Sequence, residues 1–230
     1  MFCGIDLGSR SVKLTVMSDE KKIIFNKVFE TVNFYREYGQ KTPEGLVVDF
    51  SALNIDKADT IVATGYGRNT LDIVGAIVIP ELKAHVLGAI YQTGLKDFTL
   101  LDLGGQDSKV IKVEQGKMVD FDTNDKCAAS TGRYLENMTN VLNISLDEMS
   151  NYSENPVELS STCAIFGESE LIGRIVEGYS VEELSAGVNY TIFKRIKPML
   201  IGLKSDEIIF TGGVAIGYAI KHFIETELNV

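Results

Sequence analysis

The feature that most constrains the fold of this chain is an internal repeat. When the sequence is shifted by 96 positions, the separation between Asp6 and Asp102, residues 2–25 align with residues 98–121 without a gap. A unit that recurs in the sequence is expected to fold twice, so the repeat predicts two similar half-domains. The positions that are identical in the two copies are Phe2, Asp6, Leu7, Gly8, Lys13, Lys21 and Phe25.

The second copy predicts a β-hairpin with a glycine-rich turn. An apolar run at residues 99–101 ends in Asp102, Gly104 and Gly105 follow, and the chain returns as a second apolar run at residues 110–113. Glycine tolerates a positive φ and lets a ligand approach the backbone closely. The turn would therefore offer N–H groups to an anion, and Asp102 would hold a metal ion directly or through water.

Two further glycine turns complete a pattern. Gly8 follows Asp6 in the first copy, and Gly212-Gly213 follows a short apolar strand near the end of the chain. The two acidic turns are expected to hold the phosphates and Mg²⁺ of a nucleotide from opposite sides, and the third suits the adenosine or the α-phosphate. A single glycine turn is usually only a turn, but the combination is specific. The chain has no Walker A motif, so the P-loop type of site is excluded.

Length and charge narrow the class of protein. The chain has 230 residues, and 22 basic against 32 acidic residues give a net charge of −10, which argues against nucleic-acid binding. It has neither a signal-peptide pattern nor an apolar stretch that approaches the roughly 20 residues of a membrane span. We therefore expect a cytoplasmic protein with no membrane partner, divided into half-domains at residues 1–94 and 95–230.

The remaining patterns predict the elements around the turns. Third strands should follow the two hairpins, residues 30–57 should contain a loop and a helix, and residues 60–63 should form a buried strand that leads to a glycine turn at residues 64–68. Further helices are expected at 81–93, 134–142, 164–176, 181–201 and 214–227, and a strand at 207–210.

Two cysteines stand where helices are expected to begin. A helix N-terminus stabilises a thiolate at Cys127 and at Cys163 by lowering its pKa. Two thiolates do not complete the four-cysteine shell of an iron–sulfur cluster or a structural zinc, but a two-fold dimer would supply four. The alternatives are zinc at the dimer interface and two unrelated buried thiols. Cys3, in the first strand, is expected in the core.

Six motifs occur in the order found in a known family, which the chain resembles: residues 4–9, 63–68, 102–107, 124–129, 160–163 and 211–215. Its members are the ATP-dependent activators of 2-hydroxyacyl-CoA dehydratases, with the ATPase subunits of benzoyl-CoA reductase and reductases of related double-cubane iron–sulfur proteins. The resemblance implies an α/β fold, the duplicated actin-like, sugar kinase and heat-shock chaperone ATPase fold, with two ribonuclease H-like half-domains around a nucleotide cleft.

The resemblance also implies roles for individual residues. Cys127 and Cys163 would ligate one [4Fe-4S] cluster shared by a homodimer. Asp102 would bind Mg²⁺ or orient the attacking water, Gln106 would position that water, and Asp6 would be a second metal-side acid. The residues that would contact ATP or ADP are Gly8, Ser9, Arg10, Ser11, Val12 and Lys13 in the first turn, Gly104, Gly105 and Gln106 in the second, and Gly212 and Gly213 in the third.

The activity that the resemblance implies is the coupling of ATP hydrolysis to electron transfer, rather than chemistry on an organic substrate. The cluster would take an electron from ferredoxin or flavodoxin, and ATP binding and hydrolysis would drive a hinge motion that passes it to a dehydratase or reductase at low potential. The rival is a small-molecule kinase of the same superfamily without a cluster, for which the second half shows no inserted pocket. The family usually has Gly in place of Ser130, and its members usually continue past the position of Val230 with a strand and a helix.

Overall fold

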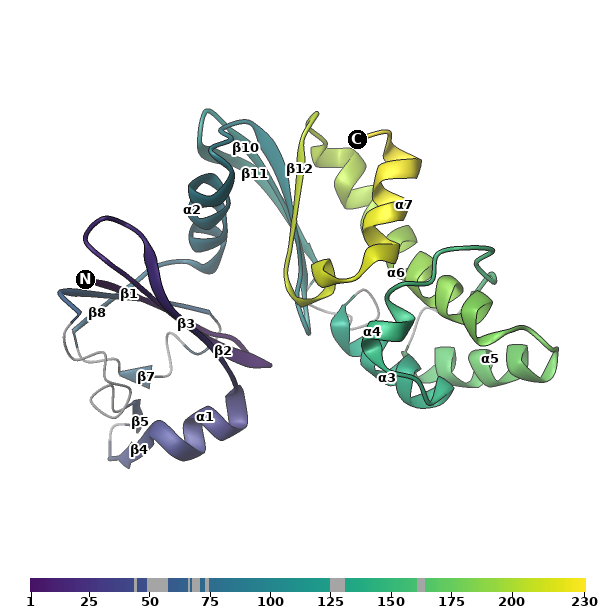
Figure 1. The fold of residues 1–230 in the computed structure, drawn as a ribbon, viewed down its shortest axis with the longest axis horizontal. Coiled ribbons are helices and arrows are strands. Elements are labelled where there is room, and N and C mark those ends of the chain that lie inside the picture. The colour runs from purple at the N-terminus through teal and green to yellow at the C-terminus, as the bar shows by residue number, and fades with distance from the viewer. Residues whose placement is uncertain are drawn as a thin grey trace. The chain divides into compact units, whose positions relative to one another are not determined.

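The computed structural model describes most of the chain, and it separates into two compact units (Figure 1). These units are Met1–Leu87 and Gly88–Val230. The domain boundary expected at residues 94 and 95 falls at the C-terminal end of helix α2 (Glu81–Thr93), within which one unit ends and the other begins. The described residues are 1–43, 45–48, 58–65, 67, 71–72, 75–124, 131–160 and 164–230.

A five-stranded sheet with the order β3-β2-β1-β6-β8 forms the first unit. Side chains alternate along its central strand, so that Cys3, Ile5 and Leu7 are buried while Phe2 and Gly4 are exposed. One face of the sheet therefore becomes the core of the unit. The first three strands of the chain pair antiparallel, whereas β6 pairs parallel to β1 and β8 pairs parallel to β6. The strands are β1 (Phe2–Leu7), β2 (Ser11–Met17), β3 (Ile23–Glu30), β6 (Thr60–Thr64) and β8 (Ala76–Val78).

The rest of the first unit packs on that core. Helix α1 (Thr31–Tyr38) places Phe34, which is fully buried, against the apolar face of the sheet. A small second sheet follows, formed by β4 (Gly39–Thr42), β5 (Gly45–Val48) and β7 (Leu71–Asp72). The helix expected between residues 30 and 57 is confirmed as α1, at the beginning of that range. Strands β4 and β5 were not predicted.

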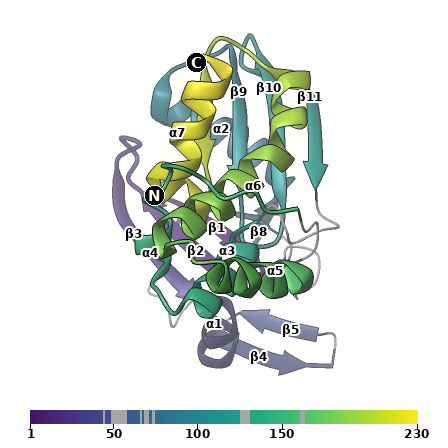
Figure 2. The same cartoon turned by 90° about the vertical axis from the view of Figure 1, so that its right-hand side faces the viewer.

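The second unit repeats the sheet with a larger helical layer. Its four strands have the order β11-β10-β9-β12, with β12 (Ile208–Thr211) parallel to β9 (Phe98–Leu103). Strands β10 (Ser108–Glu114) and β11 (Lys117–Asn124) continue the antiparallel meander. Figure 2 shows helices α6 and α7 in front of this sheet. Leu101, Leu103 and Val110 of the sheet share one core with these helices.

Most predicted helices of the second unit are found close to their expected bounds, but the terminal helix predicted at 214–227 is divided into a 3₁₀ helix and an α-helix that begins at Tyr218. Helix α6 starts with a capping box, in which the Ser180 hydroxyl and the Glu183 side chain each bond the other residue's backbone N–H. Helix α5 has the predicted bounds and α6 extends two residues beyond them. The elements are α3 (Gly132–Leu142), α4 (Leu146–Met149), α5 (Ala164–Val176), α6 (Val181–Leu203), the 3₁₀ helix η4 (Gly213–Ile216) and α7 (Tyr218–Leu228).

The strand registers confirm the internal repeat over its first two strands. Asp6 lies opposite Lys13 and Asp102 lies opposite Lys109, which are equivalent pairs under the shift of 96 residues. At the third strand the gapless alignment is wrong by one residue. Five residues separate Met17 from its partner Ile23, but only four separate Val113 from Met118, because β10 and β11 are joined by the tight turn Gln115-Gly116, whose φ angles are 52° and 73°.

The described part of the chain contains no helix with the length and apolar character needed to cross a lipid bilayer.

Candidate functional site

The first glycine turn joins β1 to β2 and is closely packed. A Cβ on Gly8 would lie 2.7 Å from the carbonyl oxygen of Ser11, so the turn admits no side chain there. The Gly8 carbonyl accepts a hydrogen bond of 2.8 Å from the Thr31 hydroxyl at the start of α1. Ser9 and Arg10 are exposed, while the side chain of Val12 is fully buried in the core. At Val12, therefore, the backbone but not the side chain is available to contact a phosphate.

Asp6 lies beside this turn with its two carboxylate oxygens in different surroundings. Oδ2 is 2.8 Å from Lys13 Nζ, in an ion pair whose lysine side chain is 52% exposed. Oδ1 is buried and accepts no hydrogen bond from the residues that the structure describes. Burial, and after it the negative charge of Asp6, raises the pKa of the nearby Tyr35.

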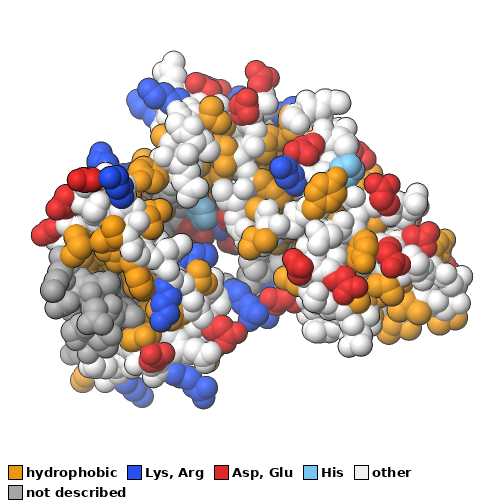
Figure 3. Space-filling view, viewed as in Figure 1, with side chains coloured by type: hydrophobic (Ala, Val, Ile, Leu, Met, Phe, Trp, Pro, Cys, Tyr) orange, Lys and Arg blue, Asp and Glu red, His pale blue; other side chains and the backbone are white. Residues whose placement is uncertain are grey.

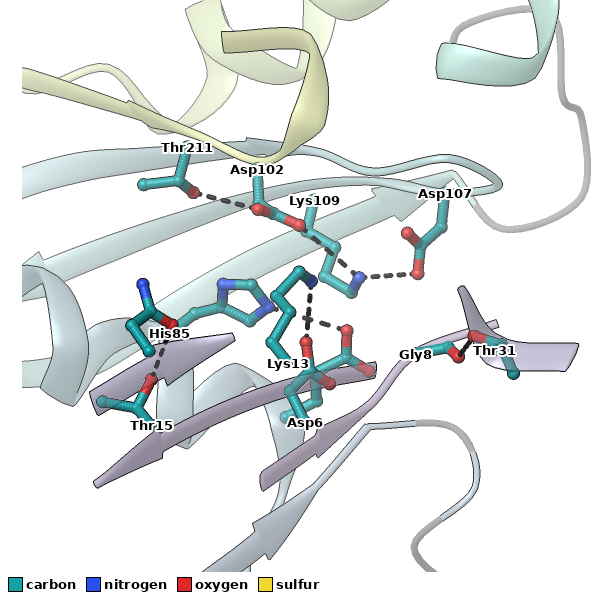
Figure 4. A network of polar contacts seen from close by, with 12 residues as sticks. Asp6, Gly8, Lys13, Thr15, Thr31, His85, Asp102, Asp107, Lys109 and Thr211 are labelled. Atoms are coloured by element: carbon teal, nitrogen blue, oxygen red, sulfur yellow. Dashed lines mark hydrogen bonds and ion pairs between the residues drawn. The ribbon is translucent and has the colours of Figure 1, made fainter. Parts of the chain in front are cut away.

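The second glycine turn joins β9 to β10 and holds its acid more firmly (Figure 4). The Gly104 N–H donates to the Asp107 carbonyl at 3.0 Å and closes the turn. Lys109, which is nearly buried, lies with its Nζ 2.6 Å from Asp107 Oδ2 and 3.8 Å from Asp102 Oδ2. The Thr211 hydroxyl donates to Asp102 Oδ1 at 2.9 Å. Gln106 is exposed at the tip of the turn.

The start of α3 is bonded to this second turn. The N–H groups of Gly132 and Arg133 donate to the carbonyls of Gly104 and Gly105, at 2.9 and 3.0 Å. These bonds fix two carbonyls of the turn on the side of the helix. A helix start is thereby attached to the candidate phosphate-binding turn through its backbone.

The third turn, at Gly212-Gly213, follows β12. Gly212 has a φ of +93°, and a Cβ there would collide with the backbone of Leu103. Gly213 opens η4, and nothing lies within 4 Å of a Cβ added to it. The first glycine is therefore required by packing, while the second leaves open space at the turn.

The strand predicted at residues 60–63 is confirmed as part of β6, and Gly65 follows it as Gly212 follows β12, an equivalence that the sequence analysis did not recognise. Gly65 has a φ of +91°, and a Cβ on it would lie 2.7 Å from backbone atoms of Leu7, the counterpart of Leu103. The preceding residues, Thr64 and Thr211, lie opposite Asp6 and Asp102. The shared Thr-Gly dipeptide at the ends of two short apolar strands is the signal that would have found this second level of the repeat.

The predicted cluster ligands, Cys127 and Cys163, lie outside the described residues. The helices that follow them are described, and their first turns pack together. A Cβ on Gly167 of α5 would lie 3.4 Å from the ring of Tyr134 in α3. Ser160, just before the second cysteine segment, donates from its N–H and hydroxyl to Glu170 Oε1 at 2.8 and 2.9 Å. No group of three or more metal-binding side chains occurs among the described residues.

Comparison with known proteins identifies the fold and the family. The chain has the actin-like ATPase fold, which it shares with MreB5 of Spiroplasma citri bound to AMPPNP at a TM-score of 0.55 and 13% identity, with 100% of this chain and 89% of that one covered. Residues 3–229 match the model of the BadF/BadG/BcrA/BcrD ATPase family. The chain belongs to this family.

Its similar relatives include named activators. The (R)-2-hydroxyglutaryl-CoA dehydratase activating ATPase of Acidaminococcus fermentans is 33% identical, over 99% of this chain and 88% of the relative. The crystal structure of component A of that dehydratase, from the same organism, has a TM-score of 0.85 at 32% identity and covers 100% of this chain and 89% of its own. The activator of 2-hydroxyisocaproyl-CoA dehydratase from Clostridium difficile with bound ADPNP has a TM-score of 0.84 at 27% identity, over 100% and 86%.

Proposed function

We propose that this chain is an ATP-hydrolysing iron–sulfur protein that delivers a low-potential electron to a 2-hydroxyacyl-CoA dehydratase or a related reductase. The observation that carries the proposal is the attachment of α3 to the second glycine turn, through the bonds of Gly132 and Arg133 to Gly104 and Gly105. The family and its named activators support the ATPase and the kind of partner.

The ATPase role rests on the two acidic turns. Carboxylate oxygens are preferred ligands of Mg²⁺, and the buried Oδ1 of Asp6, with no hydrogen-bond donor among the described residues, fits a metal-side acid. Mg²⁺, when bound, would neutralise charge on the phosphates. Asp102 would orient the attacking water, with Gln106 positioning that water. The backbones of Gly8–Lys13 and Gly104-Gly105 would contact the phosphates, and Gly212-Gly213 the adenosine side.

Two described features support the cluster as the second part of the proposal. The first turns of α3 and α5 pack together at Gly167 and Tyr134, so the segments that bring Cys127 and Cys163 enter their helices at a common end. Helix N-termini stabilise negative charge, which suits thiolate ligands. Two such cysteines from each of two subunits would bind one [4Fe-4S] cluster, which would carry the electron.

Helix α5 also offers a surface for the homodimer that this cluster requires. Four apolar side chains of α5, those of Phe166, Ile172, Ile175 and Val176, are each more than 40% accessible to solvent, and the polar Glu168 and Ser169 are exposed on the same helix. Figure 3 shows apolar side chains gathered over this helix. A group of exposed apolar side chains with a polar border favours a protein–protein contact. We therefore propose that α5, which follows Cys163 in the sequence, contributes to the dimer interface.

The geometry suggests how hydrolysis would be coupled to electron transfer. A change at the second turn on hydrolysis would reach the first turn of α3 through two backbone hydrogen bonds, without any intervening side chain. The segment that carries Cys127 enters α3 at that point. Ferredoxin or flavodoxin would supply the electron, and the dehydratase or reductase would accept it.

The experiment that tests the proposal is an analysis of iron and acid-labile sulfide on protein purified without oxygen, together with its oligomeric state. We expect about two irons and two sulfides per chain in a dimer. Cys127→Ser and Cys163→Ser should each lose the cluster, while Cys3→Ser, whose thiol is buried in the core of the first unit, should keep it. An iron-free protein that phosphorylates a small molecule would favour the kinase alternative instead.

A further inference from the structure

Thr64 and Thr211 occupy equivalent positions in the two units. Each ends a strand that runs parallel to the strand of the acid, Thr64 opposite Asp6 and Thr211 opposite Asp102. Each is followed by a glycine of positive φ that packs on the next residue after the acid. The two threonines can therefore be compared directly, because each occupies the same register position beside its acid.

The two hydroxyls donate to different acceptors. Thr211 Oγ1 donates to Asp102 Oδ1 at 2.9 Å, and Figure 4 shows the two side chains pointing toward one another. Thr64 Oγ1 donates instead to the Ile79 carbonyl at 3.1 Å. Asp6 Oδ1 consequently receives no hydrogen bond from the described residues, although it is buried.

The cause is the strand that lies beyond each threonine. In the first unit β8 pairs with β6, and the chain continues alongside it as Ile79 N–H donates to the Ala63 carbonyl at 3.0 Å. This places the Ile79 carbonyl within reach of Thr64. In the described part of the second unit, β12 is the last strand of its sheet. Thr211 has a weaker alternative there, the Leu101 carbonyl at 3.4 Å, and its shorter bond goes to the acid.

We propose that Thr211 is a positioning residue for ATP hydrolysis, which holds the Asp102 carboxylate in a fixed orientation through Oδ1. A hydrogen bond to an ionised group is short and directional, and preorganised acids need no rearrangement during the reaction. This inference rests on the proposed role of Asp102 in hydrolysis. It assigns unlike tasks to the two acids, since Asp6 keeps an oxygen free for a metal while Asp102 is oriented by the protein.

The test compares three variants by steady-state ATP hydrolysis at saturating Mg²⁺. Thr211→Val keeps the shape of the side chain and removes the donor, and we expect its kcat to fall about tenfold or more with the KM for ATP within about twofold of wild type. Thr211→Ser restores the hydroxyl and should recover at least half of the wild-type kcat. Thr64→Val, the matched control, removes the equivalent hydroxyl and should leave kcat unchanged.

Three results would overturn the inference. They are a wild-type kcat in Thr211→Val, a loss in Thr211→Ser as large as in Thr211→Val, and an equal loss in Thr64→Val. The last would mean that the threonines stabilise the fold rather than orient one acid. Absence of Mg²⁺-dependent ATP hydrolysis in the wild-type protein would overturn the proposed function itself, and the role of Thr211 with it.

Discussion

The two acid–lysine pairs of this chain are identical in sequence and strand register, yet they differ in surroundings and partners. Lys13 is half-exposed and its Nζ lies 2.8 Å from Asp6. Lys109 is only 8% exposed and lies closer to Asp107 than to Asp102. The difference in partner follows from one substitution between the copies, because Asp107 stands where the first copy has Ser11.

This difference shows how a duplicated hairpin, with the same acid and lysine in each copy, can acquire two functions. A half-exposed ion pair contributes little to stability and leaves its acid available to a ligand. A buried lysine between two carboxylates is costly to leave unpaired, so it fixes the turn that contains them. On this account the second turn is the rigid one and the first is the adaptable one. The following variants test that contrast.

The largest effect is expected from replacing the buried lysine. Lys109→Met would remove the buried cation that lies 2.6 Å from Asp107 and 3.8 Å from Asp102, and we expect a loss of about 3–4 kcal/mol in the free energy of unfolding, measured by urea denaturation. Lys13→Met, at the equivalent exposed position, should cost less than about 1 kcal/mol. Equal losses in the free energy of unfolding for the two variants would contradict the proposed difference in rigidity between the two turns.

The next effect is on activity. Asp102→Asn preserves the shape of the side chain and its bond from Thr211 but removes the charge, and we expect kcat for ATP hydrolysis to fall by about 100-fold or more. The melting temperature serves as the control for folding. A variant that folds as wild type and keeps a third of the wild-type kcat would contradict the role given to Asp102.

A smaller effect on stability should be shared by both units. Ala at Gly65 or Gly212 would place a Cβ against the backbone of Leu7 or Leu103 at a positive φ, and we expect each variant to lose about 2 kcal/mol. Gly213→Ala, which meets nothing within 4 Å, is the matched control and should stay within about 0.5 kcal/mol of wild type. A tolerated alanine at Gly212 would refute the close packing of the third turn.

The smallest effect concerns pH and the first unit alone. Burial raises the pKa of the Cys3 thiol to about 11, from 9.0 in the unfolded chain. The unfolded thiol therefore loses its proton first, and stability should fall as pH rises from 9 to 11, by about 1–2 kcal/mol. Cys3→Ala should lack this component. The second unit has Thr99 at the equivalent position, whose hydroxyl donates to the Leu203 carbonyl, so Thr99→Val should not alter the pH dependence.

Much of the fold was predictable because its signals are local. The apolar period of residues 81–93 and the N-capping residues at 160–163, which precede residues 164–176, predicted helices with the observed bounds. Strands β4 and β5 were missed because strands of four residues are too short to show an alternation of apolar and polar side chains. The third strand of the repeat was misaligned because a shorter turn changes register without changing composition.

The candidate site was predictable only in part, for a related reason. The acids and glycines could be found because their motifs are contiguous in the sequence. The orienting contact between Thr211 and Asp102 could not, since it joins residues 109 positions apart through the pairing of β12 with β9. The burial of Lys109 likewise depends on neighbours that no local pattern specifies. The roles given to Cys127 and Cys163 stay predictions, because both lie outside the described residues.

The most direct test of the unlike roles of the two turns is a Mg²⁺ titration of ATP hydrolysis in Asp6→Asn and Asp102→Asn. We predict that Asp6→Asn raises the half-activating Mg²⁺ concentration about tenfold, while Asp102→Asn lowers the maximal rate and leaves that concentration within about twofold of wild type. Lys13→Met separates loss of the ion pair from loss of a metal ligand. An equal shift in Mg²⁺ requirement in both aspartate variants, or none in Asp6→Asn, would contradict the account.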